Sequence, residues 1–281
     1  MKKLAVLFLI WFSLLCCKRD TVQELIEPRV DIVKIDAMVD HLIFDKDIPG
    51  ASVGISIKDS IVYRKGFGFT DTTKVEQIHP KSIFPIASIT KLITAIGILK
   101  LQEEGRLSIE HPITQYFPEL PKSYSKIKIK NLLNHTSGLT LMTELADSLR
   151  QYKGIDIRNE KIFDYLTPQR MNSPPNEVWA YNNTPGYLLL SLLIERVVQM
   201  DYGGFLHNYF SVPLGLKNFG LCSSGQFSNG YSLTFLMDNP MARYLDGSKI
   251  FEQLKGQGGI CASAERFVGH YDSFAKWRAH I

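Results

Sequence analysis

The sequence has few cysteines, no long hydrophobic run and no marked excess of either charge. Four cysteines are too few for a disulfide scaffold, and they do not form a zinc-binding set. Cys222 and Cys261 could pair in an oxidising compartment or remain thiols, and the sequence leaves both alternatives open. No cluster of residues has metal-ligand spacing, so we expect no metal and no organic cofactor. The formal net charge of +4 is too small to indicate a nucleic-acid partner.

What is present is the composition of an ordinary globular protein. Hydrophobic residues make up 45% of the chain and charged residues 21%. With 281 residues, the chain is long enough for one large domain or two closely associated lobes. It contains no internal repeat and no low-complexity tract.

The N-terminus has the charge and hydrophobicity pattern of an export signal. Two lysines precede an apolar run over 4–15, which is too short to span a bilayer comfortably. Cys16 and Cys17 follow directly. This arrangement resembles the lipobox of bacterial lipoproteins, which implies cleavage before a cysteine and acylation of its side chain. We predict Cys17 as the lipid site, because Leu14 then stands three residues before it. Lipidation at Cys16 and an ordinary cleaved signal are the alternatives. We therefore expect an exported, membrane-anchored lipoprotein of the bacterial cell envelope.

The rest of the chain combines one predicted hairpin with several predicted helices. Residues 18–31 are polar and aperiodic and are predicted to be a tether behind a signal peptide over 1–17, which leaves 32–281 as the folded domain. Apolar spacing and turn residues predict a helix over about 32–45, a β-hairpin over about 51–69, helices over about 89–104 and 127–134, loops and short helices over 139–178, and a helix over 184–200. Thr184 and Pro185 suit the N-cap and the first position of the last helix. This order predicts an α+β lobe into which a mainly helical lobe is inserted.

Ser88 and Lys91 are the first candidate catalytic pair. They stand three residues apart at the start of the 89–104 helix, so their side chains share one face. A serine hydroxyl is a weak nucleophile until a base removes its proton, and lysine can be that base only when it is neutral. Burial and the positive end of the helix dipole both favour the neutral amine. The same helix start directs the Ser88 N–H toward a carbonyl under attack, as one donor of an oxyanion hole. The alternative for the pair alone is a helix cap followed by a surface lysine.

Tyr181 and Asn183 form a second candidate element, in a turn directly before the helix that begins near Thr184. A tyrosine hydroxyl beside a lysine can act as a shared acid and base. An asparagine amide can donate to a substrate carbonyl and hold Lys91 through its oxygen. The alternative is an ordinary turn, in which asparagine is common.

Several short segments resemble those of a single family and appear in that family's order. They lie at 48–52, 64–68, 84–91, 101–107, 132–139, 181–183, 213–215 and 256–260. They resemble the β-lactamase-related family, which includes class C β-lactamases, D-alanyl-D-alanine carboxypeptidases and related esterases. A serine-x-x-lysine motif is a known signature of the wider group to which this family belongs. The resemblance covers about 35–267. It implies the penicillin-recognising α+β fold, in which helices flank an antiparallel sheet and a mainly helical lobe is added.

The resemblance also implies a role for each candidate residue. Ser88 would be the acylated nucleophile and Lys91 its base or proton relay. Tyr181 would be the acid/base toward the leaving group and the deacylating water, and Asn183 would hold the substrate amide. His135 belongs to a motif that is structural in the family. We therefore predict a serine acyl hydrolase that acts on peptidoglycan peptides, β-lactams or small esters.

The third element of the family is a lysine or histidine followed by any residue and then glycine, and it has no match after Gly259. In the family it lies on a strand across the cleft and supplies the second oxyanion donor. Loss of one such donor typically costs about 100- to 1,000-fold in turnover. We therefore expect the C-terminal sheet strands to be missing and the 51–69 hairpin to have an open edge. The alternatives are a truncated chain with little activity, a short form completed by a partner, and a third element that is not recognisable. If the chain is catalytically impaired or inactive, the alternative function is that of a binding protein of the cell envelope.

Overall fold

The computed structural model describes residues 30–45, 50–57, 60–70, 74–139, 171–181, 184–222 and 260–264. The chain divides into two compact units, 1–31 and 32–281, and every helix and strand described below lies in the second. The predicted signal peptide, the lipid site Cys17 and the substrate-binding candidate Asn183 lie outside the described residues.

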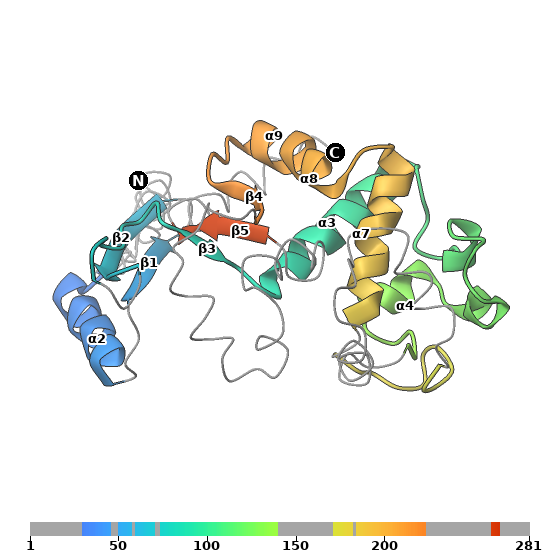
Figure 1. The fold of residues 1–281 in the computed structure, drawn as a ribbon, viewed down its shortest axis with the longest axis horizontal. Helices are drawn as coiled ribbons and strands as arrows, with labels where there is room; N and C mark the ends of the chain where they lie inside the picture. The colour runs from blue at the N-terminus through green and yellow to red at the C-terminus, as the bar shows by residue number, and fades with distance from the viewer. Residues whose placement is uncertain are drawn as a thin grey trace, which may run out of the picture. The chain divides into compact units, whose positions relative to one another are not determined.

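The second unit begins with a helix and a β-hairpin, as the sequence predicts (Figure 1). Helix α2 (Ile32–Asp45) precedes strands β1 (Gly50–Ile57) and β2 (Ser60–Gly68), which pair in antiparallel fashion. The carboxylate of Asp36 on α2 accepts hydrogen bonds from Tyr63 and Lys65 on β2, with Lys65 at 2.7 Å, and so ties the helix to the hairpin. Among the described residues β1 pairs only with β2, and no side chain of α2 is buried.

A second, three-stranded sheet joins segments that are far apart in the sequence. Strand β5 (Ile260–Ser263) lies between β3 (Ile83–Pro85) and β4 (Phe219–Leu221), and both pairings are antiparallel. All four residues of β5 are buried. A disulfide between Cys222 and Cys261 links the residue after β4 to β5, so of the two alternatives for these cysteines the structure shows the paired one.

These three strands were not predicted from the sequence. Strands of three or four residues are too short to show alternation, and Pro85 at the end of β3 argues against a strand on sequence grounds. Proline is tolerated there because β3 lies at the edge of this sheet as the described residues form it.

The main hydrophobic core lies among the helices. Its elements are α3 (Ile89–Glu103), the 3₁₀ turns η1 (Ile113–Gln115) and η2 (Lys122–Lys126), α4 (Ile129–Leu133), α7 (Thr184–Val198), α8 (Tyr202–Leu206), the π-helical turn η3 (His207–Ser211) and α9 (Val212–Leu214). Helices α3 and α7 pack against each other, and Figure 1 shows α8 above α3, to the left of the upper end of α7. Gly97 on α3 makes room for Phe205 of α8, because a Cβ there would meet the Phe205 ring at 2.8 Å. No helix within the described ranges is both long and apolar enough to cross a membrane.

The ends of α7 differ slightly from the prediction. Thr184 is the first residue of the helix rather than its N-cap, and the helix ends at Val198 rather than Met200. Gln199 has a positive φ of 60°, which stops the helix. Of the predicted loop region over 139–178, residues 171–178 contain no helix or strand, and 140–170 lie outside the described residues.

Candidate active site

Ser88 lies in a tight turn between β3 and α3. The residue before it, Ala87, has a φ of 45°, a left-handed conformation that is uncommon for a residue with a side chain. The N–H groups of Ile89 and Thr90 donate to the carbonyls of Ile86 and Ala87, so the chain turns sharply into the helix. Ser88 stands at the helix start and its side chain is exposed.

Strand β5 holds this turn from both sides. The Ile86 N–H donates to the Ile260 carbonyl at 3.0 Å, and the Ile260 N–H donates to the buried hydroxyl of Thr90 at 3.2 Å. These bonds fix the residues before and after Ser88 to the central strand of the three-stranded sheet. The turn at Ser88 is therefore positioned by a strand about 170 residues later in the chain.

Lys91 lies beside Ser88, as the spacing predicts. Its ammonium nitrogen Nζ is 3.1 Å from the Ser88 hydroxyl oxygen and donates a hydrogen bond to it. Burial lowers the pKa of Lys91 from 10.5 to about 8, because desolvation disfavours the charged amine. A lysine with this pKa is neutral in about a tenth of the molecules at pH 7. Only the neutral amine can accept a proton from Ser88.

Two tyrosines border the amine of Lys91. Nζ of Lys91 lies 5.6 Å from the ring centre of Tyr181 and 5.9 Å from that of Tyr187. Both distances are within the range of cation–π attraction. The Tyr187 hydroxyl donates to the Leu133 carbonyl at 3.0 Å, which anchors this ring to the end of α4. The structure thus brings three predicted site residues together, namely Ser88, Lys91 and Tyr181.

The sequence analysis did not identify Tyr187 and Trp179 as neighbours of the site. Tyr187 stands in the first turn of α7, and only the packing of α7 on α3 and α4 brings it to Lys91. The ring of Trp179 is 6.4 Å from that of Tyr181, and 66% of the Trp179 surface is exposed. The sequence shows Trp179 close to Tyr181, but this pattern does not indicate which residues the two rings contact.

His135 lies against the same aromatic group. Its ring centre is 5.0 Å from Tyr181 and 5.2 Å from Tyr187. Burial, and next the positive charge of Lys91, hold the pKa of His135 below its usual value of 6.5. The imidazole is therefore neutral at pH 7. Its Nδ1 atom is buried and has no hydrogen-bond partner in the part of the chain that the structure describes.

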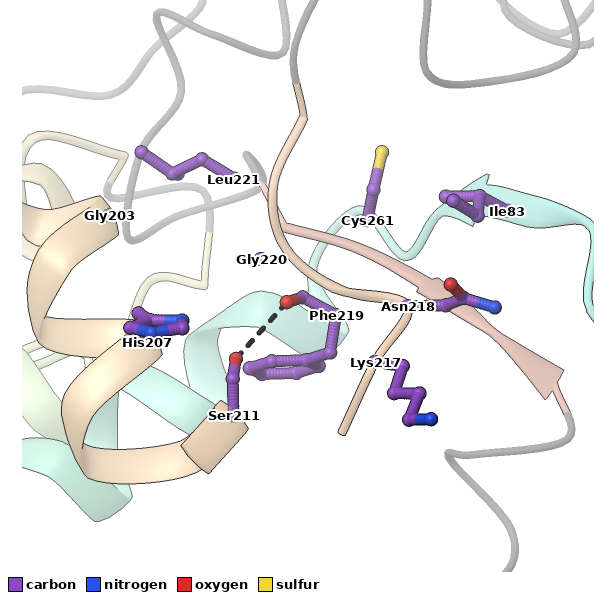
Figure 2. Close-up of a pocket in the computed structure, with 10 residues that line it drawn as sticks. All are labelled: Ile83, Gly203, His207, Ser211, Lys217, Asn218, Phe219, Gly220, Leu221 and Cys261. Atoms are coloured by element: carbon purple, nitrogen blue, oxygen red, sulfur yellow. Dashed lines mark hydrogen bonds between the residues drawn. The ribbon is translucent and has the colours of Figure 1, made fainter. Parts of the chain in front are cut away.

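The described part of the chain has a cavity of about 370 Å³ that is separate from these residues (Figure 2). It is lined by β3, β4, β5, α8 and η3, with His207, Lys217 and Asn218 among its polar side chains. Neither Ser88 nor Lys91 nor Tyr181 lines it. The chemistry described above therefore lies outside this cavity.

Curated relatives share substantial identity with this chain. It is 35% identical to "Penicillin-binding protein 4*" of Bacillus subtilis over 160 residues, which are 56% of this chain and 34% of that protein. It is 29% identical to "Protein flp" of Staphylococcus aureus over 192 residues, which are 66% of this chain and 37% of that protein. The chain thus spans about a third of the length of these relatives.

Solved structures show the same fold at lower identity. The octameric penicillin-binding protein homologue from Pyrococcus abyssi has a TM-score of 0.67 and 21% identity, and the match covers 88% of this chain and 57% of that one. The β-lactamase/D-alanine carboxypeptidase from Yersinia pestis has a TM-score of 0.65 and 22% identity, with coverage of 85% and 67%. The D-amino acid amidase from Ochrobactrum anthropi has a TM-score of 0.67 and 19% identity, with coverage of 86% and 70%. The α+β penicillin-recognising fold is thereby confirmed.

The family comparison agrees with the resemblance carried by the motifs. The family model described as Beta-lactamase matches residues 24–269, which is most of the chain and includes Ser88, Lys91 and Tyr181. The chain therefore belongs to the beta-lactamase family of serine hydrolases.

Proposed function

We infer that this protein is a serine acyl hydrolase that works through an acyl-enzyme on Ser88. The observation that carries this proposal is the contact of 3.1 Å between the Ser88 hydroxyl and a lysine amine whose pKa burial lowers to about 8. An exposed lysine would remain charged and could not accept a proton. A partly buried one supplies a fraction of neutral base at neutral pH.

The proposed reaction uses the described residues in a defined order. Neutral Lys91 takes the Ser88 proton while the serine oxygen attacks the substrate carbonyl, and the Ser88 N–H at the helix start stabilises the oxyanion. Collapse of the intermediate breaks the bond to the leaving group, which receives a proton through Tyr181. Water then attacks the acyl-enzyme and gives up a proton to the same lysine–tyrosine pair. The pair returns this proton to the departing Ser88 oxygen as the ester bond breaks and the free acid is released. Asn183 is proposed to hold the substrate amide during both steps.

The substrate class is an acyl compound with an activated or amide carbonyl. Peptidoglycan peptides, β-lactams and small esters all meet this description. The names of the similar proteins support the choice, since they include a penicillin-binding protein, a D-alanine carboxypeptidase and a D-amino acid amidase. The exposed rings of Tyr181 and Trp179 would give an apolar acyl or side-chain group a surface to contact.

The proposed location is the bacterial cell envelope, with a lipid anchor on Cys17. The disulfide between Cys222 and Cys261 supports export, because such bonds form and persist in oxidising compartments. Growth of an expressing strain with an alkyne-tagged fatty acid tests the anchor. The tag should be lost in Cys17→Ser and retained in Cys16→Ser. Retention in Cys17→Ser would refute the assignment.

The catalytic proposal is tested by covalent labelling of the full chain in detergent solution. The protein is incubated with penicillin and, separately, with a reactive fluorophosphonate, and its intact mass is measured. We expect an adduct on the parent chain that is absent from Ser88→Ala. Label from the fluorophosphonate alone would favour an ester substrate over a β-lactam. A folded parent chain that gains no mass from either reagent would refute the hydrolase and favour a binding protein without chemistry.

A further inference from the structure

The segment that carries Tyr181 has no helix or strand of its own and is attached to the turn after α4. Three of its backbone N–H groups donate to carbonyls of that turn, namely Ala180 to His135 at 2.9 Å, Asn176 to Thr136 at 2.9 Å and Asn172 to Gly138 at 2.8 Å. The side-chain amide of Asn131 adds a bond of 2.7 Å to Asn176. The position of Tyr181 is therefore set by the turn at 135–138.

His135 is the residue of this turn that is nearest to Tyr181 in both backbone and side chain. Its carbonyl holds the N–H of Ala180, the residue directly before Tyr181. Its ring packs between Tyr181 and Tyr187, at 5.0 and 5.2 Å, with Trp179 at 6.3 Å. His135 has a positive φ of 61°, and its carbonyl and its ring both contact this segment. One residue thus restrains Tyr181 at its backbone and at its ring.

Simple filling of the core does not account for this residue. A buried ring nitrogen without a hydrogen-bond partner is destabilising, and Nδ1 of His135 is buried with no partner among the described residues. Burial lowers the pKa of His135, and the nearby positive charge of Lys91 lowers it further. Both effects keep the imidazole uncharged. The neutral ring can therefore pack beside the tyrosines without repelling the ammonium of Lys91.

We propose that His135 is a positioning residue that holds Tyr181 against Lys91 through its carbonyl and its ring. This inference rests on the proposed function, in which Tyr181 transfers the proton to the leaving group and assists the deacylating water. His135 takes no part in bond making or breaking. Its contribution is the placement of the tyrosine ring, so its loss should affect the steps that need Tyr181 more than the attack by Ser88.

The test compares His135→Asn with Tyr181→Phe and with the double variant, all in the full chain. Asparagine keeps the backbone carbonyl and tolerates the positive φ, so this change removes the ring alone. Decay of the acyl-enzyme formed with penicillin or p-nitrophenyl acetate should slow about 10- to 100-fold in His135→Asn, as expected for a misplaced catalytic group. Fluorophosphonate labelling of Ser88 should change less than about threefold. The double variant should decay no more slowly than Tyr181→Phe. An unchanged decay in His135→Asn, or two losses that multiply in the double variant, would overturn the proposal.

His111→Asn is the matched control, because His111 also packs on a tyrosine ring. Its ring centre is 6.0 Å from that of Tyr116, and its Nδ1 lies 2.9 Å from the Tyr116 hydroxyl. Decay of the acyl-enzyme should be unchanged in this variant; an equal slowing there would assign the effect of His135→Asn to general loosening of the fold.

Hydrogen exchange tests the placement without activity. Amides over 171–181 should exchange at least about tenfold faster in His135→Asn and at the parent rate in His111→Asn, while peptides from α3 stay unchanged in both. If the parent chain is not acylated, the proposed function fails but exchange still decides the role of His135. Unchanged exchange over 171–181 would refute it.

Discussion

The lowered pKa of Lys91 makes the rate of Ser88 acylation a function of pH. Burial brings this pKa from 10.5 to about 8, so the neutral fraction rises from about a tenth at pH 7 to about nine tenths at pH 9. Since only the neutral amine accepts the Ser88 proton, acylation should become about tenfold faster between these pH values. Below pH 7 it should fall about tenfold for each further pH unit.

The assay is the rate of fluorophosphonate adduct formation on the full chain, measured by intact mass between pH 6 and 10. Rates are corrected for the hydrolysis of the reagent at each pH. Lys91→Met is the control, because it keeps the length and apolar stem of the side chain without the amine. Its labelling should be at least about 100-fold slower than that of the parent at pH 9 and should show no inflection near pH 8. A flat parent profile, or a midpoint near 10.5, would refute the argument that burial activates Lys91.

The same shift predicts how folding stability changes with pH. The folded chain holds its Lys91 proton less tightly than the unfolded chain, so between about pH 8 and 10.5 the unfolded state binds more protons. Stability from this group therefore rises as the pH rises through that window, and the penalty is complete below pH 8. The shift corresponds to at most about 3 kcal/mol. Because Lys91 is partly exposed, solvent screening reduces this to about 1–2 kcal/mol. Lys91→Met should be more stable than the parent by that amount at pH 7 in urea denaturation, with the difference vanishing near pH 10.5.

Three further predictions concern the parts of the fold that hold the site. Gly138→Ala should destabilise the chain by at least about 2 kcal/mol, because the new Cβ would stand 1.9 Å from a backbone carbonyl oxygen. Gly105→Ala is the control; it has a similar φ but open space around the new Cβ, and it should cost about 1 kcal/mol. Equal losses of stability in urea denaturation would contradict this prediction. The two cysteines of the Cys222–Cys261 disulfide are 39 residues apart. Reduction of this disulfide should lower the free energy of unfolding by about 4 kcal/mol and slow the labelling of Ser88. An unchanged melting temperature in dithiothreitol would contradict this prediction. Thr90→Val should cost about 1–3 kcal/mol, because it removes the hydroxyl that accepts a hydrogen bond from the Ile260 amide at the start of β5. A stability equal to the parent would show that this amide finds another partner.

The features that sequence reasoning predicted correctly depend on residues close together in the chain. Helices α2 and α3 follow from apolar spacing, and the β1–β2 hairpin follows from alternation on either side of a short turn. The contact between Ser88 and Lys91 follows from the helix alone, because residues three apart share a face whatever surrounds them. The family was also predicted from short motifs, and the family comparison confirms it.

Tertiary structure decided the features whose partners lie far apart in the chain. Strands β3, β4 and β5 are too short to show a period, and they exist because segments at least 39 residues apart pair with one another. The approach of Tyr181 to Lys91 depends on the turn at His135 and on the packing of α7 against α3. The pairing of the two late cysteines required the closing of a 39-residue separation, which spacing alone does not specify.

The sequence by itself thus determined which groups could react, and the tertiary structure decided their environment. Serine and lysine at this spacing are common in helices, and most such pairs are exposed and inert. Burial of Lys91 is what lowers its pKa to about 8, and burial is a property of everything packed around a side chain. The physical reason is desolvation, which acts through space and leaves no trace in the local pattern of residues.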